Sequence, residues 1–590
     1  MIVFLDTETR ASLDLRKVGA HRYVQCPDFT ILMLQYAVGD GPVHVLTDPE
    51  EILHAADVLL ASTERVVAHN AAFDRLVLGT FLDRDLEPQQ WIDTRVIAAE
   101  HGYPGKLEEL AVALGVTPKD SAGTRLINLF SKPKRGGGFN SPEDRPEDWQ
   151  QFVDYGENDV ITLREAYYRL PEQSPQERQV EIVDQHINDR GIKIDIPLAE
   201  AAVAAGQAME KRAKEEIIRL TGVENPGSVQ QLLAWFESSG EPLPDLRAAT
   251  VRKALETESG DRKRVLELRQ QISLASHKKF VAALDRTCAD GRARGSFFYG
   301  GAHTLRWAGR GIQLQNLPRA YLGDKEDEVI ERLLSTGEVD SEELKALVRA
   351  MLLGPFTVAD YGAIEARVLA WLAGEEWAME AFRAGRDIYV ETANRMGDNM
   401  TRHDGKTATL GLGYGGGIQA LRNVGGDGDD DHLQSLVVKW RQTNQRIVKF
   451  WDDLNKAYLH GGKAGRIEIK AVGRNRFLRL PSGRVMSYRG VKLVNGRYGR
   501  EALWESSRGP KKMWGGLLAE NVTQATARDL LAAALVRVDA AGHKVVGHVH
   551  DEIIVEGECE ELSDLMCVVP DWGDGLALAA EQEFVDRYRK

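Results

Sequence analysis

Four acidic residues and one tyrosine near the N-terminus could hold two divalent metal ions. Asp6 and Glu8 lie two positions apart in MIVFLDTET, and side-chain alternation along a strand would put them on one face. Asp74 follows the short strand-like run RVVAHN, and Tyr155 and Asp159 are four positions apart, hence on one helix face. A single DxE is usually a solvated turn, but these motifs in this order match what two hard cations and an attacking water need.

A second pair of carboxylates lies in the C-terminal half. The stretch VVGHVHDEIIVE, residues 545–556, indicates two short strands around a turn that carries Asp551 and Glu552. The stretch FTVADYGAIEARVLAWLAG predicts a strand that ends in Asp360 and runs into a helix. If the two strands are neighbours, Asp360 and Asp551 could bridge two Mg²⁺ ions that grip a triphosphate. The alternative is an ordinary turn, in which Asp and Glu are common.

Between these carboxylates, the motif RHDGKTATLGLGYGGG places Arg402, Lys406, Leu410 and Tyr414 at intervals of four residues. On a helix they would drift slowly around one face. Two cations, an apolar residue and an aromatic suit a nucleotide, with its phosphates at the cations. The alternative is an amphipathic helix that buries Leu410 and Tyr414. A P-loop is excluded, because GxxxxGK[ST] after a strand is absent.

The elements that would position these residues follow from the local patterns. Residues 1–170 mix short apolar strands with helical stretches, which predicts an α/β domain. Residues 177–285 and 396–460 are mainly helical, and residues 461–500 are Gly-rich, basic and strand-like. A chain of 590 residues should hold about three to five domains.

The charge distribution is uneven. The net charge is −14, with twenty-seven acids against seventeen Lys or Arg in residues 1–170, but fourteen Lys or Arg against three acids in residues 461–512. A basic segment in an acidic chain indicates contact with phosphate over part of the surface, although a solvated charged face is the alternative. Four cysteines without a CxxC pair and no long apolar stretch indicate a reducing, cytoplasmic compartment and no membrane.

The N-terminal motifs resemble those of the DnaQ-like 3′–5′ exonucleases of the tyrosine subtype. The resemblance implies an RNase H-like exonuclease domain over residues 1–170. It also implies that Tyr155 orients the nucleophilic water, and that four carboxylates hold the metals: Asp6, Glu8, Asp74 and Asp159.

The C-terminal motifs resemble the family A, or DNA polymerase I-like, DNA polymerases, in particular short phage enzymes. DYGAIEARVLA is similar to motif A, RHDGKTATLGLGYG to motif B and VHDE to motif C. TLRWAGRGIQLQNLP, GRDIYVETA, RQTNQRIVKFW, LPSGR and ENVTQATARDLL also fit. With the exonuclease motifs, the resemblance covers nearly the whole chain.

The resemblance implies a multidomain α/β and α+β fold in which a right-hand polymerase domain follows the exonuclease. We expect a mainly helical thumb at 171–300, the first part of the palm with motif A at 301–395, fingers with motif B and the basic template-contacting segment at 396–512, and the second part of the palm with motif C at 513–590.

In the polymerase site, the resemblance implies that Asp360 and Asp551 bridge the metals, with the carbonyl of Tyr361 as a further ligand. Glu552 would be a nearby carboxylate of lesser importance. Lys406, beside Arg402 on the triphosphate, would also protonate the leaving pyrophosphate.

The remaining roles concern sugar, base and DNA. Glu365 would exclude the 2′-oxygen of a ribonucleotide, Leu410 would lie at the sugar, and Tyr414 would stack at the templating position. His550 would lie close to the primer end, and three residues would contact the minor groove: Arg306, Gln315 and Gln524.

The expected cofactors are two Mg²⁺ ions per active site, with Mn²⁺ as a substitute. The expected partners are primer-template DNA and dNTPs, and in addition a single-strand binding protein, a helicase or a processivity factor; we expect a monomer that replicates phage DNA in a bacterial cytoplasm. Three alternatives compete with this interpretation. The first is an RNA polymerase or reverse transcriptase on the same palm, although Glu365 and the exonuclease motifs argue against an RNA product. The others are a repair or gap-filling polymerase, and a catalytically silent DNA-binding scaffold, which the intact metal carboxylates strongly disfavour.

Motif B departs from the resemblance at one position, which generates a prediction. The family usually has Phe or Tyr where this chain has Leu410, so the phenyl edge that packs on the sugar is absent. We expect Leu410→Phe to change the ratio of dideoxynucleotide to deoxynucleotide insertion, measured in single-turnover experiments beside wild type. Identical ratios would contradict the hypothesis.

Overall fold

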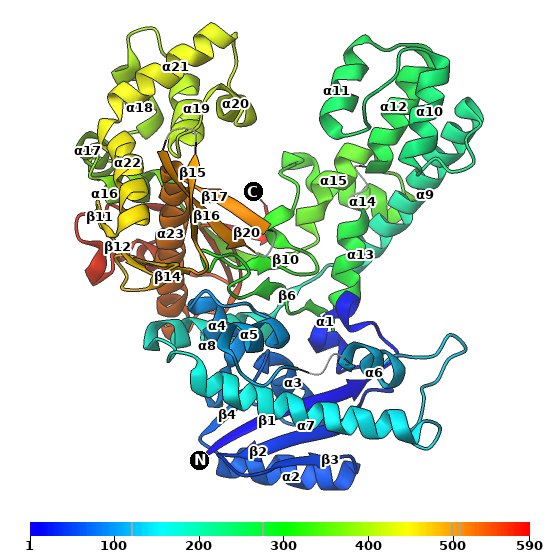
Figure 1. Cartoon of the computed structure of the whole chain (residues 1–590). Coiled ribbons are helices and arrows are strands. Elements are labelled where there is room, and N and C mark those ends of the chain that lie inside the picture. The colour runs from blue at the N-terminus through cyan, green and yellow to red at the C-terminus, as the bar shows by residue number, and fades with distance from the viewer. Residues whose placement is uncertain (120–121, 274–276, 497–498, 507–508, 590) are drawn as a thin grey trace.

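The computed structural model describes residues 1–119, 122–273, 277–496, 499–506 and 509–589 (Figure 1). Arg497 and Arg508 of the basic segment lie outside them. The N-terminal domain, at the bottom of Figure 1, contains a five-stranded mixed sheet in the order β3-β2-β1-β4-β5. Its strands are β1 (Ile2–Arg10), β2 (Thr30–Val38), β3 (Val43–Leu46), β4 (Arg65–Ala68) and β5 (Trp91–Asp93).

Helices complete the N-terminal domain. They are α1 (Leu15–Tyr23), α2 (Pro49–Ser62), α3 (Ala71–Phe81), α4 (Thr94–Glu100), α5 (Leu107–Leu114), α6 (Gly123–Phe130) and α7 (Pro146–Arg169). The long α7 contacts β1, β2 and β3, because its apolar face, including Phe152, Val160 and Leu163, is buried. Every strand and helix that positions the N-terminal acids is therefore part of one packed unit.

A second sheet, with four antiparallel strands, lies at the centre of the molecule, in the order β18-β19-β10-β20 (Figure 1). Its strands are β10 (Leu353–Tyr361), β18 (Val545–Val549), β19 (Glu552–Glu556) and β20 (Ala580–Arg587). Apolar residues of β10, β18 and β19 belong to the largest hydrophobic core, together with the long helix α23 (Gly515–Ala540). The two strand segments predicted from the sequence are thus neighbours in one buried sheet.

Two helical arms rise on either side of this sheet (Figure 1). After α8 (Pro175–Arg190), the first arm contains α9 (Ile196–Thr221), α10 (Val229–Ser239), α11 (Ala248–Thr257), α12 (Gly260–Ser273) and α13 (His277–Arg286). Its outer helices have a hydrophobic cluster of their own, which includes Leu232, Phe236 and Val265. Two further helices, α14 (Glu326–Thr336) and α15 (Ser341–Ala350), follow between the arm and β10.

The second arm is built from helices and two small sheets. The helices are α16 (Ile364–Ala373), α17 (Glu376–Arg383), α18 (Ile388–Met396), α19 (Arg402–Leu412), α20 (Ile418–Asn423), α21 (Asp430–Thr443) and α22 (Gln445–His460). The sheets contain β11 (Gly462–Ala464), β12 (Ile467–Val472), β13 (Asn475–Arg479) and β14 (Val485–Tyr488), and β15 (Lys492–Gly496), β16 (Gly499–Ser506) and β17 (Gly509–Met513). The basic segment is therefore β-rich, as its sequence predicts.

Short elements complete the chain: β6 (Ile192–Lys193), β7 (Arg292–Ala293), β8 (Phe297–Phe298), β9 (Ala308–Gly309) and α24 (Leu562–Cys567). Within the described ranges, every helix is too short or too polar to cross a membrane.

The helix α19 begins and ends for local reasons. Thr401 and Asp404 form a reciprocal capping box at its N-terminus. The helix ends at Leu412, where glycines recur at 411, 413 and 415–417, so Tyr414 lies just beyond it rather than on it. The predicted four-residue spacing therefore holds on the helix only for Arg402, Lys406 and Leu410.

Close packing of α18 against α19 generates a stability prediction. A Cβ at Gly405 would lie 1.9 Å from the carbonyl oxygen of Tyr389, whereas a Cβ at Gly417 would meet no atom within 4 Å. We expect Gly405→Ala to destabilise the chain by about 1–3 kcal/mol through overpacking. Denaturant unfolding would measure the loss, with Gly417→Ala as the matched control; equal midpoints for the two variants would contradict it.

Candidate active sites

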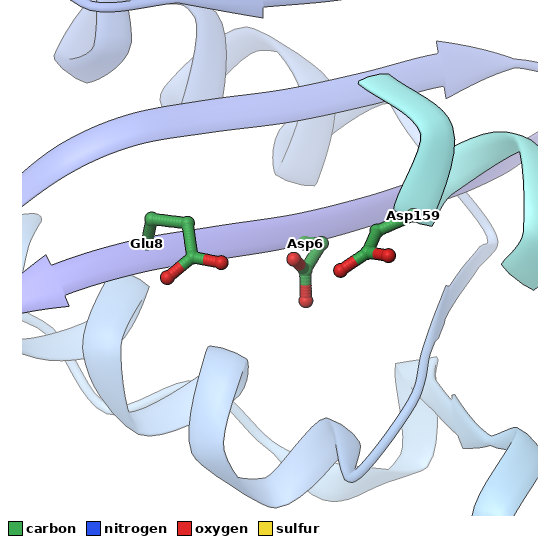
Figure 2. Close-up of side chains that lie close together, drawn as sticks. All are labelled: Asp6, Glu8 and Asp159. Atoms are coloured by element: carbon green, nitrogen blue, oxygen red, sulfur yellow. The ribbon is translucent and has the colours of Figure 1, made fainter. Parts of the chain in front are cut away.

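Three of the predicted N-terminal acids come together. Asp6 and Glu8 project from the same face of β1, and Asp159 projects toward them from α7 (Figure 2). One carboxylate oxygen of each lies within 4.8 Å of those of the other two. An all-oxygen donor set of this kind fits Mg²⁺, Mn²⁺ or Ca²⁺.

Burial and crowding govern the electrostatics of this cluster. Burial, and next the charge of Asp159, raise the pKa of Asp6 to about 7. Burial likewise raises the pKa of Glu8 well above its ordinary value, with Asp6 and Asp159 adding to the effect. Since like charges in a low-dielectric site oppose ionisation, a bound cation would stabilise the charged carboxylates.

The other two predicted residues adjoin the cluster. The Asp74 Oδ1 accepts hydrogen bonds from the Thr7 amide, at 3.1 Å, and from the Thr7 hydroxyl, at 2.7 Å. Asp74 lies outside the group of three, but its charge acts on the pKa of Glu8. The buried Tyr155 has its pKa raised by burial and then by Asp159, which keeps the phenol protonated.

A lysine that the sequence analysis missed faces the same acids. The Lys119 Nζ lies 2.7 Å from Asp159 Oδ2 and 4.9 Å from the centroid of the Tyr155 ring. Burial lowers the pKa of Lys119, but Asp159 and Asp6 raise it by more, so the amine stays charged. Lys119 therefore supplies positive charge at the cluster. No local motif indicates this role, because Lys119 lies in an irregular connection after α5.

The backbone segments that carry the predicted C-terminal carboxylates lie side by side. β10 pairs with β19 so that Asp360 is opposite Glu552, and the Tyr361 amide donates to the Asp551 carbonyl at 3.1 Å. His550 adopts a left-handed conformation, with φ of 55°, in the two-residue turn between β18 and β19. The adjoining backbones bring the half-buried Asp360 and Asp551 to the same end of the sheet. Carboxylates at this point, beside the Tyr361 carbonyl, fit a hard divalent cation.

Glu552 does not lie in the turn, so the prediction that the turn carries both carboxylates is wrong. It is the first residue of β19, is 2% exposed, and accepts a hydrogen bond from the Tyr588 hydroxyl at 2.7 Å. Strand pairing draws it into the interior, so the turn itself presents only His550 and Asp551.

Several other predicted residues converge on Glu365, at the start of α16. Its carboxylate accepts from Arg306 Nη2 and from the Tyr414 hydroxyl, each at 2.8 Å. The pKa of His550 is lowered by burial and then by Arg306, and Glu365 also acts on it. The Gln524 amide donates to Glu520, at 3.3 Å, and burial followed by Glu365 raises the pKa of Glu520. Glu520 is a second residue that sequence reasoning missed.

The predicted cations and Leu410 lie on the surface of α19. Arg402, Lys406 and Leu410 are exposed, Leu410 by 48%, so the alternative of an amphipathic helix that buries Leu410 is wrong. Arg402 Nε is 2.7 Å from Asp387 Oδ2, and its guanidinium lies over the Tyr389 ring. The exposed Leu410, one turn beyond Lys406, leaves this face of α19 open to a ligand.

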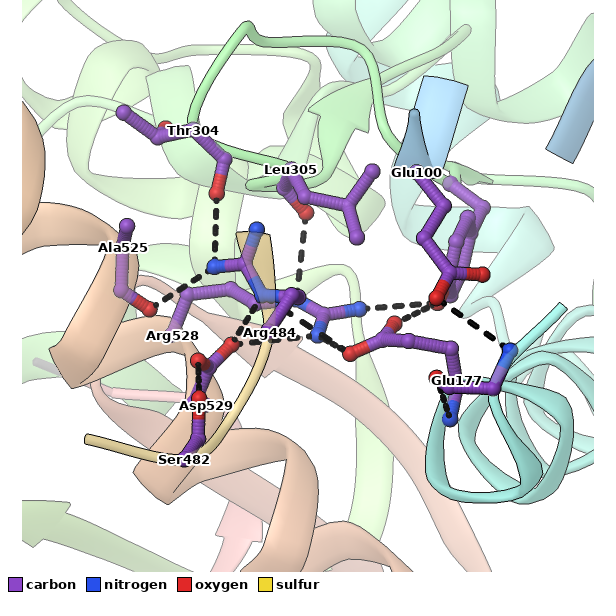
Figure 3. A network of polar contacts seen from close by, with 11 residues as sticks. Glu100, Glu177, Thr304, Leu305, Ser482, Arg484, Ala525, Arg528 and Asp529 are labelled. Atoms are coloured by element: carbon purple, nitrogen blue, oxygen red, sulfur yellow. Dashed lines mark hydrogen bonds and ion pairs between the residues drawn. The ribbon is translucent and has the colours of Figure 1, made fainter. Parts of the chain in front are cut away.

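A buried polar network holds the chain segment that contains Arg306 (Figure 3). Arg528, 1% exposed, donates to Glu177 at 2.6 Å, to the Tyr299 hydroxyl at 2.9 Å and to the Leu305 carbonyl at 3.1 Å. Beside it, Arg484 donates to Asp529 at 2.8 Å. The network joins α8, α23 and the segment before Arg306.

Comparison with known proteins decides the family. The model for DNA polymerase family A matches residues 198–572. The chain is 37% identical to the DNA polymerase of Bacillus phage SP02, over 99% of each chain. The chain is a family A DNA polymerase of phage type. The polymerase is also 21% identical to the DNA polymerase of Mycobacterium phage D29, covering 87% of this chain and 80% of that one.

Cellular relatives match at lower sequence identity than the phage SP02 enzyme. The polymerase is 28% identical to the thermostable DNA polymerase I of Thermus filiformis over 64% of this chain, and the match spans 43% of that protein. The POL domain of Pol1 from M. smegmatis, solved in complex with a DNA primer-template and dNTP, matches with a TM-score of 0.63 at 17% identity, over 98% of this chain and 94% of that one. This likeness shows the family A fold, with mixed α and β content.

The positive charge of Lys119 leads to a prediction about the stability of the metal-free polymerase. Lys119→Met would leave buried acids uncompensated and destabilise the N-terminal domain by about 1–3 kcal/mol in EDTA. Hydrogen exchange of the β1 and α7 amides would measure the loss, and saturating Mg²⁺ should reduce it. The exposed Lys106, 2.8 Å from Glu109, provides the control Lys106→Met. An equal loss in EDTA and in Mg²⁺ would mean that Lys119 acts through packing alone.

Proposed function

We propose that this enzyme extends a primer 3′ end with deoxynucleotides and proofreads the product with a separate 3′–5′ exonuclease. The observation that carries the proposal is the register of β10 on β19, which brings Asp360 and Asp551 to one end of a sheet far along the chain from the carboxylate cluster of β1 and α7. Two sites with oxygen ligands and different surroundings fit two phosphoryl-transfer reactions.

In the polymerase site, Asp360, Asp551 and the Tyr361 carbonyl would be the metal ligands. Arg402 and Lys406 on the exposed face of α19 would bind the triphosphate, and Lys406 would give a proton to the pyrophosphate. Divalent ions, Mg²⁺ in our proposal, would lower the pKa of the primer hydroxyl here and of a water at the N-terminal cluster, and neutralise charge on the phosphoryl group.

Glu365 would select deoxyribose over ribose, and it would be hydrogen-bonded to the residue at the templating position. Its bonds to Arg306 and Tyr414 tie a residue proposed for the minor groove to one proposed for the templating position. If the site closes on a matched base pair, both contacts of Glu365 would have to rearrange together. Such coupling favours a check of base-pair geometry over a reading of base sequence. Gln315, Gln524 and His550 would contact the primer end, with Leu410 at the sugar.

In the exonuclease site, Asp6, Glu8, Asp74 and Asp159 would hold the metals, and Tyr155 would orient the attacking water. The protonated phenol can donate a hydrogen bond, which is what an orienting role requires. Lys119, charged beside Asp159, would neutralise part of the same cluster.

The corresponding domains would be an exonuclease at 1–170, a thumb at 171–300, palm segments at 301–395 and 513–590, and fingers at 396–512. The basic 461–512 segment would contact the template backbone. We propose a replicative role for a phage, in the cytoplasm of its bacterial host, with primer-template DNA and dNTPs as partners.

Separate substitutions test the two sites. We expect Asp551→Ala to reduce primer extension by about a hundredfold or more while 3′-end degradation persists, because only one metal site loses a ligand. We expect Asp6→Ala to do the reverse. A 5′-labelled primer-template with Mg²⁺, with and without dNTPs, measures both activities.

Exposed acids outside the clusters serve as controls. Glu558, just beyond β19, and Asp57, on α2, give Glu558→Ala and Asp57→Ala, which should leave both activities unchanged. The proposal of two separate sites is wrong if Asp551→Ala and Asp6→Ala each abolish both activities in folded protein.

A further inference from the structure

A cavity of about 560 Å³ lies where the N-terminal domain meets α8 and α23. Glu100, the last residue of α4, lines it from the N-terminal domain, and Arg484 and Asp529 line it from the polymerase half. Uncharged residues form an apolar wall: Val180, Val485, Ala532, Ala533, Val536 and Trp572. Pockets that enclose small organic ligands measure roughly 300–1,000 Å³, so the cavity has room for one. None of the residues assigned to the two active sites lines it.

The buried charges around this cavity pair one to one, except for Glu100. Arg528 donates to Glu177 at 2.6 Å, and Arg484 donates to Asp529 at 2.8 Å (Figure 3). Hydroxyl groups satisfy the remaining oxygens of these two carboxylates. Two arginines thus compensate two acids, and Glu100 is a third buried acid that forms no ion pair with any described residue.

Glu100 also lacks a full set of hydrogen bonds. It is 7% exposed; its Oε1 accepts from the Ser174 amide at 3.3 Å, whereas its Oε2 has no hydrogen-bond partner within the described ranges. Figure 3 shows this side chain pointing toward Glu177. Burial, opposed by the bond from Ser174 and aided by the charge of Glu177, raises the pKa of Glu100 to about 7. Above this pH the ionised, buried acid favours a cation beside it.

The exposed part of the lining carries a further acid. Glu172 lies in the connection before α8, and two exposed amide side chains, those of Gln176 and Gln179, line the cavity as well. His101 adds no positive charge near neutral pH, because burial lowers its pKa while its ring bonds to the Glu172 carbonyl at 3.0 Å. The lining therefore combines a buried acid, an exposed acid and an apolar wall.

We propose that the cavity binds a linear aliphatic diammonium ion, with one ammonium at Glu100, the other at Glu172 and the methylene chain along the apolar wall. An ammonium group donates hydrogen bonds and compensates the charge of Glu100, while methylene groups favour apolar surface. The ion would bridge α4 and the connection before α8, beside the pair of Arg528 and Glu177.

A metal ion fits this cavity less well than an organic cation. In the described part of the chain, the only group of three or more ligand side chains close enough to share a metal ion is the carboxylate cluster of β1 and α7. The apolar wall, moreover, offers a hard cation no oxygen ligands.

Calorimetric titration of the full-length enzyme with 1,5-diaminopentane tests the assignment at about pH 8, where Glu100 is ionised and the amines, like that of lysine, are protonated. Saturating Mg²⁺ keeps the amines from the metal-binding carboxylates. Pentylamine and pentane-1,5-diol are matched probes with one ammonium group and none. We expect the diamine to bind about threefold more tightly than pentylamine, and the diol not to bind.

Two substitutions separate the ends of the ligand. Glu100→Gln should weaken the binding of both amines by about tenfold, because a buried, charge-assisted hydrogen bond is lost. Glu172→Gln should weaken diamine binding by about threefold and leave pentylamine binding unchanged, because only the exposed ion pair is lost. Glu108→Gln is the matched control, since Glu108 is an exposed acid on α5 of the same domain and outside the cavity lining.

Diamine affinity that is unchanged in both cavity variants, or equalled by pentane-1,5-diol, would overturn the proposal. Equal affinity for pentylamine and the diamine would also overturn it, because one ammonium group, such as a lysine side chain of another protein, would then suffice. Glu172 is exposed, so Glu172→Gln tests the assignment even if Glu100→Gln fails to fold.

Discussion

The buried ion pair between Arg528 and Glu177 determines how the parts of this polymerase meet. Arg528 is almost inaccessible to water, so each of its donors needs a protein partner. Those partners come from α8, from Tyr299 and from the Leu305 carbonyl (Figure 3). Because an unpaired buried guanidinium would be costly, the three segments cannot shift independently of α23.

The candidate polymerase site depends on this arrangement. Leu305, held through its carbonyl, has a positive φ of 66° and directly precedes Arg306, whose guanidinium reaches Glu365. Gln524 lies one turn before Arg528 on the same helix. The network thus fixes two residues that we assign to the minor groove, while Asp360 and Asp551 are fixed separately by strand pairing. The proposed primer-end contacts and the proposed metal ligands are therefore positioned by different interactions.

Much of the local structure could be predicted because its causes are local. Apolar alternation and β-branched runs indicated β1, β10 and the hairpin, and four-residue spacing indicated the shared face of Tyr155 and Asp159. The four-residue spacing wrongly predicted that α19 continues to Tyr414. The glycines around this residue are the sequence signal that the helix ends at Leu412.

Contacts between distant segments could not be predicted in this way, because no local sequence pattern marks them. Lys119 reaches Asp159 from an irregular connection, and a lone lysine there has no pattern that distinguishes it from a solvated one. Glu177 and Arg528 are 351 residues apart, so only the folded chain shows that they pair. Glu552 was expected at the turn, but pairing of β19 with β10 places it inside, where Tyr588 donates to it.

The two-residue turn between β18 and β19 restricts how this gene can vary. Side chains of β19 alternate between the two faces of the sheet, and the turn sets which residue is opposite Asp360. Adding or deleting one codon here would invert that alternation and carry Asp551 out of position, whereas replacing a codon alters one side chain only. The length of this hairpin is therefore more tightly constrained than the identity of its residues other than Asp551.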